Sequence, residues 1–153
     1  MPYKRHDPAP EEELLKHMKG DNTLCNTLIE MYRLTTDSDT MLKIRIAFSM
    51  GKSMCNRLAF YKEKYGFQDG ETRDGVWVEF RQRDPIDIRE MDKSRWEGHH
   101  SICQTLRDIY HMTNDDTLRV KSRIAMSMTK AMHEKLKSYK LLETGGQDVN
   151  NGS

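Results

Sequence analysis

The sequence has few of the residues that interrupt helices or cross-link chains. Four prolines and nine glycines are spread over 153 residues, too few for a collagen-like or low-complexity protein. Three cysteines, a small and odd number, exclude a disulfide framework as the source of stability. Cys25 and Cys103 fall at equivalent positions of a repeat described below. We therefore expect small buried thiols in a reducing, intracellular protein.

The chain also lacks an excess of charge of one sign and a long apolar run. Its 25 Lys and Arg residues and 24 Asp and Glu residues give a net charge of +1. This balance excludes a general attraction to nucleic acid or to anionic membranes, so any anion site must be a local patch. No apolar run approaches the roughly 20 residues of a membrane-spanning helix, and residues 1–7 are polar. We expect a cytoplasmic protein with no signal peptide, no membrane anchor and no membrane partner.

What the sequence does contain is a long internal repeat. The pattern K-x-R-I-A-x-S-M-x-K-x-M occurs at residues 43–54 and again at residues 121–132. The ungapped match extends over residues 20–62 and 98–140, at a constant offset of about 78 residues, with roughly 18 of 43 positions identical. We interpret the chain as a duplication of one helical unit, and the two copies can pack as a pseudo-twofold pair.

The spacing of apolar residues predicts an all-α fold in a single domain. Each repeat is expected to contain a short leading helix followed by a helical hairpin, and the longest helices are predicted at residues 39–65 and 116–142. One side of these two helices should form the core of a pseudo-twofold helical bundle. Its residues are Ile46, Ala47, Met50, Met54, Leu58 and Tyr61 in the first copy, and Ile124, Ala125, Met128, Met132, Leu136 and Tyr139 in the second.

The predicted organisation has four parts. Repeat one is placed at residues 7–65, a connector at 66–83, repeat two at 84–142, and a mobile tail at 143–153. Asp-Gly turn signals precede the weakly alternating segment Val76–Phe80, so a short β-hairpin is predicted in the connector.

The polar faces opposite the core contain the candidate binding residues. Arg, Ser and Lys recur at i, i+4 and i+7, and we call the two sets the first ridge (Arg45, Ser49, Lys52) and the second ridge (Arg123, Ser127, Lys130). These side chains suit an oxyanion, so the ridges predict binding of a phosphate-bearing ligand, a nucleotide or nucleic acid. The alternative is that the cations pair with acidic residues on neighbouring helices, or that the copies have not diverged.

No motif for catalysis or for a metal accompanies the ridges. Ser49 and Ser127 have no sign of a base near them in the sequence, and there is no phosphate-cradling glycine loop. We therefore expect neither enzymatic activity nor a cofactor. His99 and Cys103 have the i, i+4 spacing of metal ligands, but the first repeat does not contain the same pair. We expect no metal site.

The two hairpins resemble small, uncharacterised helical proteins of tailed bacteriophages. The resemblance is in the run at residues 101–111, the pair Asp115-Asp116 and the shared K-x-R-I-A-x-S-M-x-K-x-M pattern, and it does not cover the connector. It implies a phage protein in the host cytoplasm, and it implies no activity and no site residues. The alternative function is therefore a virion or scaffold component, or a binder of a host protein, that acts through protein contacts and can form a homo-oligomer.

Overall fold

The computed structural model is an all-α helical bundle with one small sheet. It describes residues 7–16, 24–65, 71–73, 76–78, 84–93 and 102–144. The helices in these ranges are α1 (Glu11–Lys16), α2 (Leu24–Arg33), α3 (Ser38–Tyr65), α4 (Ile88–Lys93), α5 (Ile102–Met112) and α6 (Asp116–Glu143). The prediction of an all-α bundle is confirmed. None of these helices combines the length and the hydropathy needed to cross a membrane.

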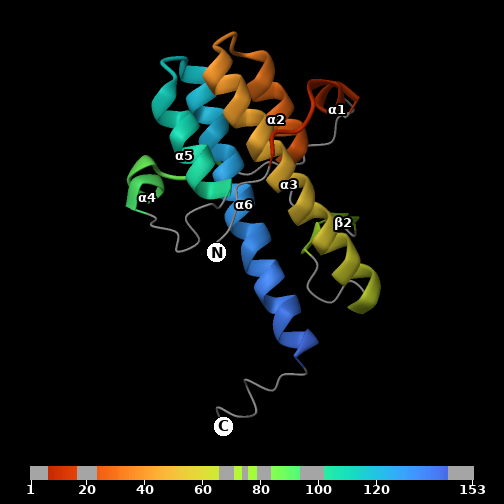
Figure 1. Cartoon of the computed structure of the whole chain (residues 1–153). Helices are drawn as coiled ribbons and strands as arrows, with labels where there is room; N and C mark the ends of the chain where they lie inside the picture. Colours follow the sequence, from red (N-terminus) through yellow and green to blue (C-terminus); the bar gives the residue numbers. More distant parts are fainter. Residues whose placement is uncertain are drawn as a thin grey trace, which may run out of the picture.

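Helices α2 and α3 form one antiparallel hairpin, and α5 and α6 form another (Figure 1). Asp37 caps α3, because its carboxylate accepts a hydrogen bond from the Thr40 N–H at 2.9 Å. Asp115 caps α6 by accepting a hydrogen bond from the Leu118 N–H at 2.9 Å. Both turns lie at the same end of the molecule (Figure 1). Helices α3 and α6 therefore run in the same direction and continue beyond the shorter α2 and α5.

The core lies between the two hairpins. Eleven of the twelve apolar residues predicted to form it are buried, and the twelfth, Ile124, is partly exposed but packs against it. A second buried face of α3 packs against α2 so closely that a Cβ atom at Gly51 would lie 3.2 Å from Leu24 Cδ2. Toward the far ends of α3 and α6, the rings of Tyr61 and Tyr139 stack with their centroids 5.4 Å apart.

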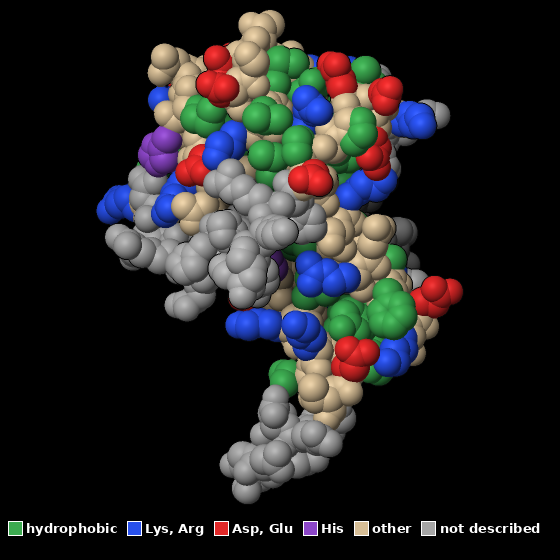
Figure 2. Space-filling model, in the orientation of Figure 1, with side chains coloured by type: hydrophobic (Ala, Val, Ile, Leu, Met, Phe, Trp, Pro, Cys, Tyr) green, Lys and Arg blue, Asp and Glu red, His purple; other side chains and the backbone are tan. Residues whose placement is uncertain are grey.

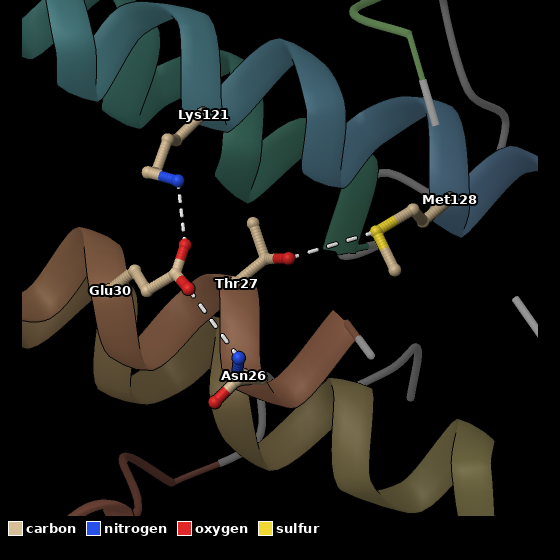
Figure 3. A network of polar contacts seen from close by, with 5 residues as sticks. All are labelled: Asn26, Thr27, Glu30, Lys121 and Met128. Atoms are coloured by element: carbon tan, nitrogen blue, oxygen red, sulfur yellow. Dashed lines mark hydrogen bonds and ion pairs between the residues drawn. The ribbon is translucent and has the colours of Figure 1, made fainter. Parts of the chain in front are cut away.

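Ion pairs join the two hairpins at positions that correspond in the repeats. Lys121 of α6 pairs with Glu30 of α2, with 2.6 Å between Nζ and Oε1 (Figure 3). Lys43 of α3, the counterpart of Lys121, pairs with Asp108 of α5 at 3.1 Å. Asp108 is in turn the counterpart of Glu30. Each hairpin therefore gives the other an equivalent contact.

A two-stranded antiparallel sheet lies in the connector. Strand β1 (Glu71–Arg73) pairs with β2 (Val76–Val78), and Thr72 stands opposite Trp77. The other connector residues between 66 and 83 lie outside the described part of the chain.

The last residue of α6, Glu143, falls in the segment that the sequence predicts to be a tail. Glu143 is helical, and its carboxylate accepts a hydrogen bond from the Tyr61 hydroxyl at 2.8 Å and pairs with Lys64 at 3.1 Å. The Thr144 N–H then donates to the Lys140 carbonyl at 3.0 Å. The helix therefore continues past the predicted start of the tail, and residues 145–153 lie outside the described ranges.

Candidate functional site

The arginines of the two ridges hold the leading segments against the long helices. Arg45 donates from Nε to the Ala9 carbonyl at 2.7 Å, and the Ala9 N–H donates to the Arg45 carbonyl at 3.1 Å. Arg123 donates from Nε to the Ile86 carbonyl at 2.7 Å, and the Ile86 N–H donates back at 3.2 Å. Each arginine thus clamps the residues that precede α1 or α4 in the same way.

The lysines of the ridges pair with the leading helices. Lys52 lies 2.6 Å from Glu13 of α1, and Lys130 lies 3.0 Å from Glu90 of α4. These contacts match the alternative interpretation, in which the ridge cations pair with acidic residues on neighbouring helices. Packing of the leading helices therefore accounts for the recurrence of Lys in both copies.

The two ridges lie on opposite sides of the bundle. Helix α1 packs on α3 over the first ridge and α4 packs on α6 over the second, and Figure 1 shows these two short helices on opposite sides. The serines differ, since the Ser49 hydroxyl donates to the Asp7 carbonyl at 2.7 Å, whereas the Ser127 hydroxyl makes no hydrogen bond within the described ranges. The six ridge residues do not converge on one site.

A cavity of about 840 Å³ opens beside the first ridge, between α1, α3 and the end of α6. Ser49 and Lys52 contribute to its wall. A larger part of the lining comes from four α3 residues at i, i+3, i+4 and i+7, the spacing of one helix face. We call this set the cavity face: Ser53, Asn56, Arg57 and Phe60.

The polar side chains of the cavity face have no partner among the residues that the structure describes. In the part of the chain that the structure describes, the side chains of Ser53, Asn56 and Arg57 make neither a hydrogen bond nor an ion pair. Asn56 and Arg57 are exposed and Ser53 is half-buried. Their donors remain available to a ligand, unlike those of the ridge lysines.

The carboxylates that line the cavity are each compensated by a lysine. Glu13 pairs with Lys52 at 2.6 Å, and Glu143 pairs with Lys64 at 3.1 Å. The cation of Arg57 is therefore left without a counter-ion among the described residues at the cavity. An anion that enters the cavity would supply one.

Phe60 completes the cavity face with an exposed aromatic ring. Its side chain is 57% exposed, more than any other large hydrophobic side chain that the structure describes. The ring contacts Tyr61 edge to face, with centroids 5.3 Å apart, and Lys64 Nζ lies 5.9 Å from its centroid.

The second repeat does not have the same face. At the four corresponding positions it has Ala131, Glu134, Lys135 and Ser138. The hydroxyl of Ser53, the amide of Asn56 and the ring of Phe60 therefore have no counterpart at the corresponding positions of α6. Identity between the two repeats does not reveal the cavity face, and the signal in the sequence is the divergence of the repeats at these positions within the matched stretch.

The cavity lies at the basic end of the long helices. Residues 52–65 and 130–143 contain eight Lys or Arg residues and three Glu residues, although the whole chain is nearly neutral. Figure 2 shows basic side chains gathered over the lower part of α6, whereas acidic and basic side chains are interspersed over the upper part of the molecule. The local potential at this end favours an anionic ligand.

The pKa values of the buried Cys103 thiol and of the half-buried His133 imidazole are shifted from their ordinary values. Burial raises the pKa of the Cys103 thiol to about 12, so it is protonated at neutral pH. Burial, and then the nearby charge of Arg57, lower the pKa of His133. The described residues contain no cluster of three or more His, Cys, Asp or Glu side chains that could hold a metal ion. His99 lies outside the described residues.

No protein-family model matches this chain, and no curated protein or solved structure is detectably similar to it. Any ligand of this chain must therefore be inferred from the residues around the cavity.

Proposed function

We propose that this is a non-enzymatic binding protein that holds a compact phosphate-bearing ligand, a nucleotide or a short piece of nucleic acid, in the cavity beside the first ridge. One observation carries the proposal: Ser53, Asn56 and Arg57 line the cavity and have no partner among the described residues. A hydroxyl, an amide and a guanidinium are donors that phosphate oxygens accept. The uncompensated charge of Arg57 and the basic surroundings favour the same ligand.

Only two of the six ridge residues take part in the proposed site, although their recurrence in both repeats predicted that all six would bind the ligand. Ser49 and Lys52 line the cavity, whereas Arg45 holds the chain before α1 and the second ridge lies on the other side. A phosphate that reached Lys52 would compete with Glu13, so the main contacts are assigned to Arg57 and Ser53. Long duplex DNA, whose binding depends on many neutralised phosphates, is disfavoured by the near-neutral chain.

Isothermal titration calorimetry with nucleoside monophosphates, cyclic dinucleotides and short oligonucleotides tests the proposal. For a ligand that binds, Arg57→Ala should weaken affinity by about 1.5–3 kcal/mol, the range for hydrogen bonds to charged groups. Lys135→Ala is the matched control, because it removes a positive charge at the corresponding turn of α6, and it should leave affinity unchanged. Equal losses in the two variants would indicate only general electrostatic attraction. Absence of heat with every ligand would overturn the proposal.

The duplication and the phage setting are part of the same proposal. The matching sequences, the equal 28-residue lengths of α3 and α6, and the reciprocal Lys43–Asp108 and Lys121–Glu30 contacts support a tandem duplication packed about a pseudo-twofold axis. The resemblance to small phage proteins supports a role in the host cytoplasm. A binder of this kind would act by sequestering its ligand.

The second candidate function is a protein contact, in a virion, in a scaffold or with a host protein. Large apolar side chains are exposed at corresponding positions near the hairpin turns of both repeats: Leu34 with Met112, and Leu42 with Val120, each 37–42% exposed. A surface kept apolar in both copies favours partners that recognise both hairpins. Size-exclusion chromatography with light scattering tests this candidate. A monomer at high concentration that captures no partner in a pull-down would argue against it.

A further inference from the structure

Phe60 is the one large apolar side chain of the cavity face, and the fold does not require it. Its corresponding residue on α6 is Ser138, so this turn of a long helix forms without a ring. Other apolar residues on the same half of α3, Met54 and Leu58, are each 2% exposed and belong to the core. Phe60 is 57% exposed and contributes little to that core. An exposed ring at a cavity is available to cover an apolar part of a ligand.

The contacts of Phe60 leave a surface suited to stacking. The Tyr61 ring meets it edge to face at an interplanar angle of 68°, and Lys64 Nζ lies 5.9 Å from its centroid. More than half of the side chain remains uncovered, and the residue lines the cavity. A planar aromatic group is the partner that covers such a ring best, since offset stacking adds to the burial of apolar area.

The spacing along α3 places this ring at a fixed reach from the phosphate donors. Arg57 is one turn away from Phe60, with about 5–6 Å between such Cβ atoms on a helix. Ser53 is two turns away, about 10 Å along the axis. A nucleotide has a planar base at one end of its sugar and a phosphate at the other. A base on Phe60 would direct the phosphate toward Arg57 and Ser53.

We propose that Phe60 stacks on the base of a free nucleotide and thereby makes the cavity selective for base-bearing phosphates over other phosphate compounds. This inference rests on the proposed function, which concerns only the phosphate end of the ligand. Stacking is tolerant of base identity, so discrimination among the four bases should be small. The cavity volume of about 840 Å³ is in the range for a small-molecule site, and we assign a free nucleotide as its ligand.

Calorimetric titration of the full chain with AMP, ribose 5-phosphate and a single-stranded hexadeoxyadenylate tests the inference. The wild type should bind AMP more tightly than ribose 5-phosphate by roughly five- to 150-fold, the range for base stacking on an aromatic side chain. Phe60→Ala should reduce this ratio to about one and leave the affinity for ribose 5-phosphate unchanged. Phe60→Tyr should retain the ratio. Ser138→Ala, at the corresponding position of α6, is the matched control and should change neither affinity.

The other possible results of these titrations each overturn a different claim. Equal affinity of the wild type for AMP and ribose 5-phosphate would overturn the stacking inference and leave the proposed function standing. A loss of affinity for both ligands in Phe60→Ala would assign Phe60 a structural role and also overturn the inference. Much tighter binding of the hexanucleotide than of AMP would overturn the assignment to a free nucleotide. No binding of any of the three would overturn the inference, whereas the proposed function fails only if the cyclic dinucleotides and the other ligands of its own calorimetric series are silent as well.

Discussion

At the scale of single residues, identity between the repeats marks structural contacts. Arg45 and Arg123 are identical because each clamps the chain before a short helix, with the same Nε-to-carbonyl distance of 2.7 Å. Arg57, by contrast, has no described partner, and its neighbours on the cavity face differ between the copies. The two matching segments form hairpins that need the same contacts, so identical residues occur where those contacts are made. A ligand site needs to be retained in only one of them.

Glu143 predicts a pH-dependent contact between the ends of the long helices. The hydrogen bond from Tyr61, and then the contact with Lys64, lower the pKa of the Glu143 carboxyl below its ordinary value of 4.5. A lowered pKa in the folded state stabilises the fold above the ordinary value, and this contribution is lost as pH falls through the lowered pKa. We expect Glu143→Gln to melt at a lower temperature than wild type at pH 7, and the difference to shrink below about pH 4.5.

Thermal melting followed by circular dichroism between neutral and acidic pH measures this effect. Glu134→Gln, at an exposed glutamate of the same helix, is the control and should melt like the wild type throughout. A Glu143→Gln difference that stays constant down to acidic pH would contradict the proposed titration.

At the scale of elements, the long helices and the short ones are stabilised differently. Helices α3 and α6 each have 28 residues, and Asp37 and Asp115 supply their caps. Helices α1 and α4 have six residues each, too short to be stable alone. Their stability comes from packing and from the clamps on the long helices. Ala9 and Ile86, whose backbone groups bind Arg45 and Arg123, are both buried.

The arginine clamps predict local changes in hydrogen exchange. Arg45→Ala removes the bond to the Ala9 carbonyl, and the range of about 1.5–3 kcal/mol for such bonds implies roughly tenfold or faster exchange of the Ala9 amide. Arg123→Ala should have the same effect at the Ile86 amide. Exchange measured by NMR or mass spectrometry should show that each variant affects its own leading segment and not the other. Unchanged exchange at Ala9 in Arg45→Ala would exclude the clamp.

At the scale of the whole molecule, reciprocal contacts hold the two hairpins together. The Lys121–Glu30 pair joins α6 to α2, and the Lys43–Asp108 pair joins α3 to α5. Glu30 also accepts a hydrogen bond from Asn26 at 3.4 Å, so its carboxylate is held in place on α2 (Figure 3). The apolar core supplies most of the stability between the hairpins, because ion pairs as exposed as these contribute little.

A charge exchange across one of these pairs predicts energetic coupling. Lys121→Glu and Glu30→Lys should each destabilise the protein, because each places like charges together, and the double variant should recover part of the loss. The lysine and glutamate side chains are 24% and 39% exposed, so we expect a coupling of about 0.5–1 kcal/mol. Urea unfolding of the four proteins measures it. Lys121→Glu combined with Asp108→Lys, which are not paired, should show additive effects.

Local patterns in the sequence determined the all-α class, the two hairpins, the helix caps and most of the core. Each of these depends on residues a few positions apart, as when Asp115 caps the helix that begins at the next residue. The helix end at Glu143 was missed because its stabilising partner, Tyr61, lies 82 residues away.

The candidate site was decided by the tertiary structure. Arg, Ser and Lys side chains can bind a phosphate, and they can equally bind a backbone carbonyl and a glutamate of a neighbouring helix. The pattern alone therefore did not distinguish a ligand site from a structural contact. Lys52 and Glu13 are 39 residues apart, and only the packing of α1 on α3 brings them together. The same packing leaves Arg57 without a described partner at the cavity, because the wall opposite comes from α1 and from the last residue of α6. No local spacing encodes that arrangement.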